Sequence, residues 1–162
     1  MNKQRIEKVA VIGAGLMGHG IALEIAAAGY HVNLYDVTED ILYKARKNID
    51  YGLQKQVDSG KIKNDQVSKT KSIIKTSNDL GNQLKDVDLV IEAAPESVSI
   101  KQDLFKKFGE LCPSHTILAS NTSSLKPSLY AEHSNRPDKV LVMHYANPQH
   151  LVPLVEIVRG HK

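Results

Sequence analysis

The chain has 162 residues, 41% hydrophobic and 24% charged, which is an ordinary composition for a soluble protein of one domain. Its formal net charge is +3, and its lysines and arginines are spread along the sequence, so we expect no nucleic-acid partner. The single cysteine, Cys112, excludes an internal disulfide bond and favours a reducing, cytoplasmic location.

Strands and helices are predicted to alternate along the chain. Short apolar runs bounded by turn residues predict strands at 8–12, 31–35, 72–76, 88–92, 116–119, 139–144 and 154–158. Segments with apolar residues every three or four positions predict helices at 16–28, 39–57 (after the N-cap Thr38), 64–70 and 98–111. Strands separated by helices form mostly parallel sheets with helices on both faces, so the predicted fold class is α/β.

A glycine-rich run, Gly13-Ala14-Gly15-Leu16-Met17-Gly18, connects the first predicted strand to the first predicted helix. In the pattern G-x-G-x-x-G, Gly13 permits the tight turn, Gly15 lets the backbone approach a pyrophosphate, and Gly18 lets the helix pack against the strand. The helix N-terminus offers N–H groups to phosphate. The run predicts a Rossmann-type, doubly wound sheet, and we assign Gly13, Gly15, Leu16, Met17 and Gly18 to cofactor binding.

Asp36 ends the second predicted strand, 18 residues after Gly18. A carboxylate at this position accepts hydrogen bonds from the adenosine ribose and repels a 2′-phosphate. Val37 and Thr38 provide no arginine that could hold such a phosphate. We therefore expect the cofactor to be NAD rather than NADP.

Polar residues follow the fourth and fifth predicted strands, where ligands of an open α/β sheet bind. Glu96 and Lys101 are placed to touch the nicotinamide half of the cofactor, although a helix N-terminal carboxylate and a solvated lysine would give the same pattern. The run from Ser120 to Ser124 offers hydrogen-bond donors for a substrate oxygen, or forms a simple turn.

His144 ends the sixth predicted strand, and Glu156 lies inside the apolar run of the seventh. A carboxylate buried in such a run needs a partner, and the neighbouring imidazole is a natural one. A carboxylate that holds one ring nitrogen of a histidine makes it a good general base, although a lone histidine is often structural. A general base beside NAD indicates oxidation of a secondary alcohol. A non-catalytic NAD-binding module is the alternative of another class, and it has no use for a base.

Taken together, these motifs resemble the L-3-hydroxyacyl-CoA dehydrogenase family, including 3-hydroxybutyryl-CoA dehydrogenases, over essentially the whole chain. The resemblance is carried by the glycine run, Asp36, the run from Ala119 to Leu125, and His144-Tyr145-Ala146-Asn147-Pro148 with Leu154-Val155-Glu156-Ile157-Val158. It implies NAD-dependent oxidation of an L-3-hydroxyacyl-CoA in fatty acid metabolism (beta-oxidation). The implied roles are His144 as catalytic base, Glu156 as its orienting carboxylate, Ser123 bound to the substrate's 3-oxygen, and Glu96, Lys101, Asn121 and Asn147 as cofactor contacts.

Two departures from the family pattern leave the substrate open. Ala146 stands where the family usually has an aromatic residue, which leaves a smaller wall near the nicotinamide. The runs Ala94-Pro95-Glu96 and Lys126-Pro127-Ser128 also resemble dehydrogenases of free 3-hydroxy acids, such as L-carnitine or L-gulonate. The substrate is therefore either an acyl-CoA thioester or a free 3-hydroxy acid.

The family has a second, all-helical domain that dimerises and closes the substrate cleft. We expect residues 1–162 to form the NAD-binding domain without it, to bind NAD, and to turn over slowly or not at all. The resemblance implies a homodimer for the full-length protein.

Neither a metal site nor membrane association is expected from the sequence. No apolar stretch approaches the roughly 20 residues of a membrane span, and the polar segment from Met1 to Lys8 is unlike a secretory signal. Six histidines show no metal-ligand spacing with cysteine or acidic residues, namely His19, His31, His115, His133, His150 and His161.

Overall fold

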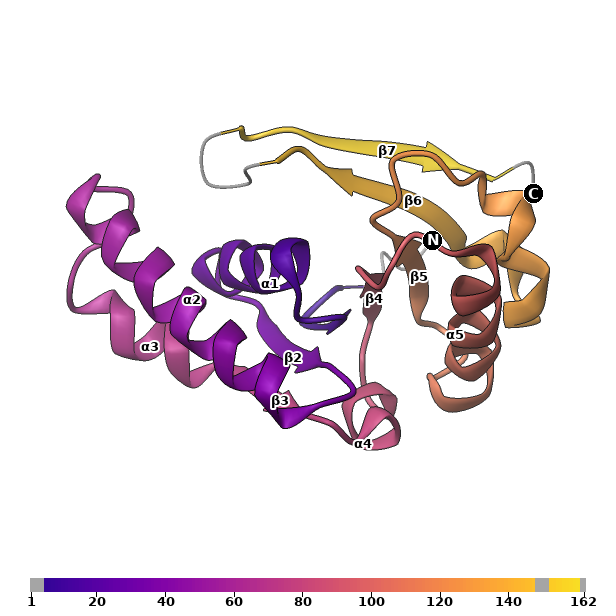
Figure 1. The fold of residues 1–162 in the computed structure, drawn as a ribbon, viewed down its shortest axis with the longest axis horizontal. Coiled ribbons are helices and arrows are strands. Elements are labelled where there is room, and N and C mark those ends of the chain that lie inside the picture. Colours follow the sequence, from indigo (N-terminus) through magenta and orange to yellow (C-terminus); the bar gives the residue numbers. More distant parts are fainter. Residues whose placement is uncertain (1–4, 148–151, 161–162) are drawn as a thin grey trace.

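The computed structural model describes residues 5–147 and 152–160 of the chain, so Pro148, His150 and His161 lie outside the described residues. The described residues form a seven-stranded sheet in the order β3-β2-β1-β4-β5-β6-β7 (Figure 1). The strands are β1 (Lys8–Ile12), β2 (His31–Tyr35), β3 (Ile74–Ser77), β4 (Leu89–Glu92), β5 (Ile117–Ser120), β6 (Val140–Tyr145) and β7 (Val155–Arg159). Neighbours from β3 through β6 are parallel, and β7 is antiparallel to β6, which confirms the predicted mostly parallel sheet.

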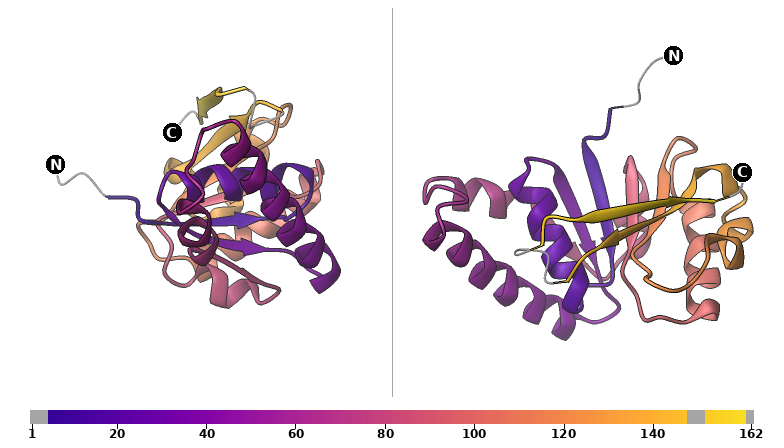
Figure 2. Two further views of the ribbon diagram at one scale, coloured as in Figure 1. Left: turned by 90° about the vertical axis from the view of Figure 1, so that its left-hand side faces the viewer. Right: turned by 90° about the horizontal axis from the view of Figure 1, so that it is seen from above.

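Helices cover both faces of the sheet (Figure 2). They are α1 (Leu16–Ala27), α2 (Glu39–Asp58), α3 (Gln66–Ser72), α4 (Leu80–Leu84) and α5 (Val98–Leu111), with 3-10 turns η1 (Pro127–Leu129), η2 (Ala131–Ser134) and η3 (Pro137–Lys139). The sequence analysis missed α4 and the three 3-10 turns, because elements this short show no apolar period. No helix within the described ranges is long and apolar enough to cross a membrane.

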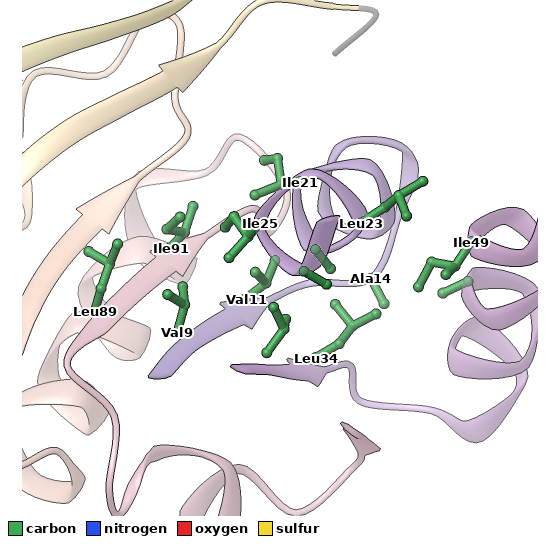
Figure 3. Close-up of a cluster of buried hydrophobic side chains, with 14 of the residues drawn as sticks. Val9, Val11, Ala14, Ile21, Leu23, Ile25, Leu34, Ile49, Leu89 and Ile91 are labelled. Carbon is green, nitrogen blue, oxygen red and sulfur yellow. The ribbon is translucent and has the colours of Figure 1, made fainter. Parts of the chain in front are cut away.

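Alternating side chains of the central strands supply two separate cores. Val9 and Val11 of β1 point toward α1 and α2, and Figure 3 shows them beside Ile21 and Ile25 of α1. The intervening Ala10 and Ile12 face α4, α5 and η2 on the opposite side of the sheet. Because successive strand residues point to opposite faces, a continuous apolar strand such as β1 must be covered on both sides.

After β1 the chain passes to β2, which lies on one side of β1 within the sheet. It later enters β4, which lies on the other side of β1. This reversal makes the carboxyl ends of β1 and β4 a topological switch point, where an open α/β sheet forms its ligand crevice. In the strand register Ile12 lies beside Glu92, and Glu92 lies beside Ser120, so the ends of β1, β4 and β5 are level. The segments that follow these strands therefore meet in one place.

The strand β7 is exposed along its whole length, and this corrects the expectation that Glu156 is buried. Ile157 and Val158 of β7 are 55% and 51% exposed. An apolar run usually marks a strand with cover on both faces, but β7 pairs only with β6, and no described helix packs over it. The position of the strand was predicted correctly, but the prediction that it is buried was wrong.

Candidate active site

A cavity of about 280 Å³ lies at the carboxyl ends of β4, β5 and β6. It brings together seven of the residues predicted to bind cofactor or substrate, which come from five different segments of the chain. Its lining consists of Met17, Glu92, Ala93, Ala94, Glu96, Lys101, Asn121, Ser123, His144, Tyr145 and Asn147. The predicted residues Gly13, Gly15, Leu16, Gly18 and Asp36 lie outside this lining, on the loop after β1, in the first turn of α1 and just after β2.

The loop after β1 has the geometry that the glycine pattern predicts. Gly13 has φ +103°, and a Cβ on it would lie 2.6 Å from the carbonyl oxygen of Ala93. A Cβ on Gly18 would lie 1.7 Å from the carbonyl oxygen of Gly13, so α1 can approach the loop only with glycine there. A Cβ on Gly15 would meet nothing within 4 Å, which leaves open space above the loop.

This open space fits the phosphates of a dinucleotide. Gly15 is the N-cap of α1 and provides no side-chain cap, and the first turn of α1 contains no acidic side chain. The positive end of the helix dipole therefore faces the space above Gly15 without a competing carboxylate. Leu16, at the start of the helix, is apolar and yet 73% exposed, as expected of a residue that a ligand covers.

Asp36 has a role in the structure that the sequence analysis missed. Its Oδ2 accepts a hydrogen bond of 2.7 Å from the N–H of Ala14, and its Oδ1 accepts one of 2.7 Å from the N–H of Val37. The carboxylate thus holds the glycine loop against the end of β2. Each oxygen retains a second lone pair, so the ribose contact stays a prediction that is compatible with the geometry.

His144 and Glu156 lie directly opposite each other in the antiparallel β6–β7 pair. His144 Nδ1 and Glu156 Oε2 are 2.8 Å apart, with side chains 30% and 59% exposed. The pairing was predicted from burial, but strand register produces it. A neutral imidazole that donates Nδ1–H to the carboxylate keeps a lone pair on Nε2, which is the arrangement of a general base.

Glu92 is a site residue that the sequence analysis did not assign. It is fully buried at the end of β4, and its carboxylate accepts hydrogen bonds from Lys101, Ser120 and the N–H of Ala94. Lys101 is also buried and lies 3.3 Å from Glu96, so its ammonium is bound to two carboxylates instead of being solvated. A signal was present in the sequence: a carboxylate at the end of an apolar strand needs a partner.

The remaining predicted residues differ in how firmly they are held. Asn121 Oδ1 accepts a 2.8 Å hydrogen bond from the N–H of Tyr145, so this side chain joins the ends of β5 and β6. Glu96 accepts hydrogen bonds from the hydroxyls of Thr122 and Ser124. Burial raises the pKa of Glu96, but these hydroxyls and Lys101 outweigh burial and hold the pKa below its usual value. Ser123 and Asn147 are exposed at the cavity.

Across residues 5–147 and 152–160, no three His, Cys, Asp or Glu side chains cluster as the ligands of a metal ion would. Cys112 is buried, and burial raises the pKa of its thiol to about 12. The thiol is therefore not a nucleophile at neutral pH.

The glycine loop, Asp36 and the cavity at the switch point define an NAD-binding domain of the dehydrogenase type. The family model described as "3-hydroxyacyl-CoA dehydrogenase, NAD binding domain" matches residues 8–162. The chain therefore belongs to this family, and the predicted family and the predicted cofactor, NAD, are confirmed.

Relatives and solved structures agree with this assignment. The chain is 42% identical over 159 residues to mitochondrial hydroxyacyl-coenzyme A dehydrogenase of Sus scrofa, covering 95% of this chain and 51% of that protein. It is 38% identical over 162 residues to a peroxisomal fatty acid beta-oxidation multifunctional protein of Oryza sativa subsp. japonica, covering all of this chain and 22% of that protein. The structure of (S)-3-hydroxybutyryl-CoA dehydrogenase from Ralstonia eutropha matches with a TM-score of 0.92 and 32% identity, covering 97% of this chain and 55% of that one. The chain thus spans between about a fifth and about half of these proteins.

Proposed function

We propose that this chain is the NAD-binding half of a dehydrogenase that oxidises the 3-hydroxyl group of an L-3-hydroxyacyl-CoA. The observation that carries the proposal is the 2.8 Å pair of His144 Nδ1 and Glu156 Oε2 beside a cavity at the switch point of the sheet. Membership of the family and the names of the two curated relatives support the reaction class and a place in beta-oxidation.

The residues of the cavity divide the work between binding and proton transfer. The glycine loop and Asp36 would hold the adenosine and phosphate parts of NAD, and Met17, Glu96, Lys101, Asn121 and Asn147, which line the cavity, would surround the nicotinamide. NAD, when bound, accepts the carbinol hydride. His144 Nε2 takes the hydroxyl proton, Glu156 keeps the opposite nitrogen protonated, and Ser123 donates a hydrogen bond to the substrate's 3-oxygen.

Replacement of His144 by alanine tests this function. The assay uses the longest natural polypeptide that carries this sequence, because the relatives are longer than the chain. We expect His144→Ala to lower kcat by about 10²–10⁴-fold and to change the Kd of NAD by less than about twofold. NADH formation followed at the nicotinamide absorbance band gives the rate, and calorimetry gives the affinity.

His31→Ala is the matched control, because His31 is exposed at the start of β2 and far from the end of the sheet that carries the cavity. Undiminished turnover in His144→Ala would show that another residue is the base. Equal loss of turnover and NAD binding would show a structural role for the imidazole, and a wild type that binds NAD but oxidises no 3-hydroxy substrate would support a non-catalytic module.

The same assay separates the two substrate classes. We expect oxidation of L-3-hydroxybutyryl-CoA at a kcat/KM at least about 100-fold above those of free L-3-hydroxybutyrate and L-carnitine, because remote binding groups contribute to transition-state stabilisation. A higher kcat/KM with a free acid would assign the protein to the dehydrogenases of free 3-hydroxy acids.

The family resemblance also supports a homodimer of the whole protein, and the single cysteine supports a cytoplasmic location. The relative from Oryza sativa is named as peroxisomal and the one from Sus scrofa as mitochondrial, so related proteins occupy different compartments. Light scattering on the whole protein and microscopy of a tagged copy are the measurements that decide these two points.

A further inference from the structure

Glu92 is a fully buried carboxylate at the switch point, and all of its acceptor positions are occupied. Oε1 accepts from Ala94 N–H at 2.7 Å and from Lys101 Nζ at 3.0 Å. Oε2 accepts from Lys101 Nζ at 2.8 Å and from Ser120 Oγ at 2.5 Å. Three donor groups make four contacts with the two oxygens, which is the geometry of an ionised carboxylate.

The ammonium of Lys101 is equally committed. It lies 1% exposed between Glu92 and Glu96, within hydrogen-bonding or ion-pairing distance of three carboxylate oxygens. An ammonium has three N–H donors, so none is left over for a cofactor without breaking one of these contacts. Lys101 and its two partners therefore act on a ligand mainly through their charges.

The charges of this cluster of Glu92, Glu96 and Lys101 do not cancel. Two carboxylates and one ammonium leave a net charge of −1, and all three side chains line the cavity. The lowered pKa of Glu96 keeps that carboxylate ionised at neutral pH. Charges in a site shielded from water interact more strongly than charges in bulk solvent.

We propose that Glu92 is a specificity-determining residue, which raises the affinity of the cavity for NAD+ relative to NADH. The nicotinamide ring carries a positive charge in NAD+ and none in NADH, so a cluster of net charge −1 attracts only the oxidised ring. Without the charge of Glu92, the ammonium of Lys101 cancels Glu96, and the attraction disappears. The inference rests on the proposed function, which places the nicotinamide in this cavity.

The test compares the Kd of NAD+ and NADH in the 162-residue chain and in Glu92→Gln. The substitution preserves shape and removes one negative charge. We expect Glu92→Gln to raise the Kd of NAD+ about tenfold and the Kd of NADH less than about threefold, which corresponds to one unit charge acting over several ångströms at an intermediate dielectric. Calorimetry gives the first constant, and NADH fluorescence gives the second.

A double variant keeps the test independent of folding and of simple structural damage. Glu92→Gln with Lys101→Met removes one charge of each sign, so the cluster returns to −1 and no unpaired ammonium remains buried. We expect the ratio of the two Kd values to return to within about threefold of the wild type, even where both affinities fall. Thr116→Val is the control for loss of a buried hydrogen bond in the sheet. Thr116 is buried, its hydroxyl donates a hydrogen bond to the carbonyl oxygen of Val87, and it is absent from the cavity lining.

The outcomes are distinct. Equal weakening of NAD+ and NADH binding by Glu92→Gln, or a double variant that keeps the altered ratio, would overturn the inference and leave Glu92 a structural residue. A wild-type chain that binds neither cofactor would instead contradict the proposed function. A ratio that moves in Glu92→Gln, returns in the double variant and stays fixed in Thr116→Val supports the inference.

Discussion

Carboxylates that accept backbone N–H groups hold separate segments of this chain together. Asp36 binds the N–H of Ala14, and Asp88 binds those of Glu7 and Lys8. In each case the acid lies at or beside the end of one strand and its N–H partner lies in a segment that packs against it. A carboxylate offers two strong acceptors on a short side chain, so it can satisfy backbone groups that no strand ladder reaches.

Asp88 lets this role be tested as a function of pH. Burial raises its pKa, but the N–H groups of Glu7 and Lys8 and the side chain of His115 outweigh burial, so the pKa lies below its usual value. A lowered pKa in the folded state means that the stabilisation is complete above about pH 4 and is lost as the pH falls through the folded-state pKa. We expect Asp88→Asn to lower the free energy of unfolding by about 1–2 kcal/mol at pH 7 and by far less at pH 2–3.

Urea unfolding at both pH values measures this effect. Asp103→Asn is the control, because Asp103 is exposed on α5 and should show no difference at either pH. A loss in Asp88→Asn that is the same at both pH values would assign the effect to shape rather than to charge.

At the scale of elements, α5 is held at its C-terminal end by the segment that follows β5. The guanidinium of Arg136 donates to the carbonyl oxygens of Gly109, Cys112 and Pro113, which lie at the end of the helix and just beyond it. Phe105 of α5 packs against Tyr130, with ring centroids 4.5 Å apart. The hydrogen bonds of Arg136 satisfy carbonyl groups that a helix end leaves free. Together with the packing of Phe105 on Tyr130, they hold α5, the helix that carries Lys101, in place.

Gly109 lies where α5 and η2 touch, and replacing it with alanine should separate them. An added Cβ would lie 2.2 Å from the carbonyl oxygen of Ser134, and backbone cannot move aside cheaply. Alanine favours a helix by about 1 kcal/mol over glycine, so a net loss would show that the contact is the larger effect. We expect Gly109→Ala to lower the free energy of unfolding by about 2–4 kcal/mol.

Gly52→Ala in α2 is the matched control. There the added Cβ would meet only the end of the Leu23 side chain, at 2.5 Å, and that group can rotate away. We expect a change of less than about 1 kcal/mol, measured by the same denaturant titration. Equal effects of the two substitutions would mean that α5 and η2 are not in close contact.

At the scale of the whole molecule, one sheet joins two cores to a single ligand crevice. The core beneath α1 and α2 carries the glycine loop, and the core beneath α5 carries the Glu92 cluster. NAD bound across the switch point would contact both halves at once. A ligand that binds only the folded state stabilises it by an amount set by its concentration relative to Kd.

We therefore expect NAD at 100 times its Kd to raise the melting temperature by about 5–10 °C, equivalent to roughly 2.7 kcal/mol. Calorimetric scans with and without NAD provide the measurement. Gly18→Ala should lose this shift, because its Cβ would lie 1.7 Å from the carbonyl oxygen of Gly13 and displace the loop. A full NAD-dependent shift in Gly18→Ala would show that the loop is not the phosphate site.

The sequence by itself determined the order of the strands and longer helices along the chain, the glycine loop and the position of Asp36. These features depend on local period and on residues whose chemistry is restricted to few roles. The exposure of β7 could not be read in the same way, because an apolar run shows what a strand can bury and not what is present to cover it.

Only the tertiary structure decided what surrounds each charge. The register of β4 and β5 places Ser120 beside Glu92, and α5 brings Lys101, nine residues along the chain from Glu92, back to the same carboxylate. The sequence analysis treated Lys101 as a cofactor contact or a solvated lysine, and in the structure it is buried between two carboxylates. Burial and strand register are properties of the assembled sheet, so the electrostatic character of the cavity became visible only with the fold.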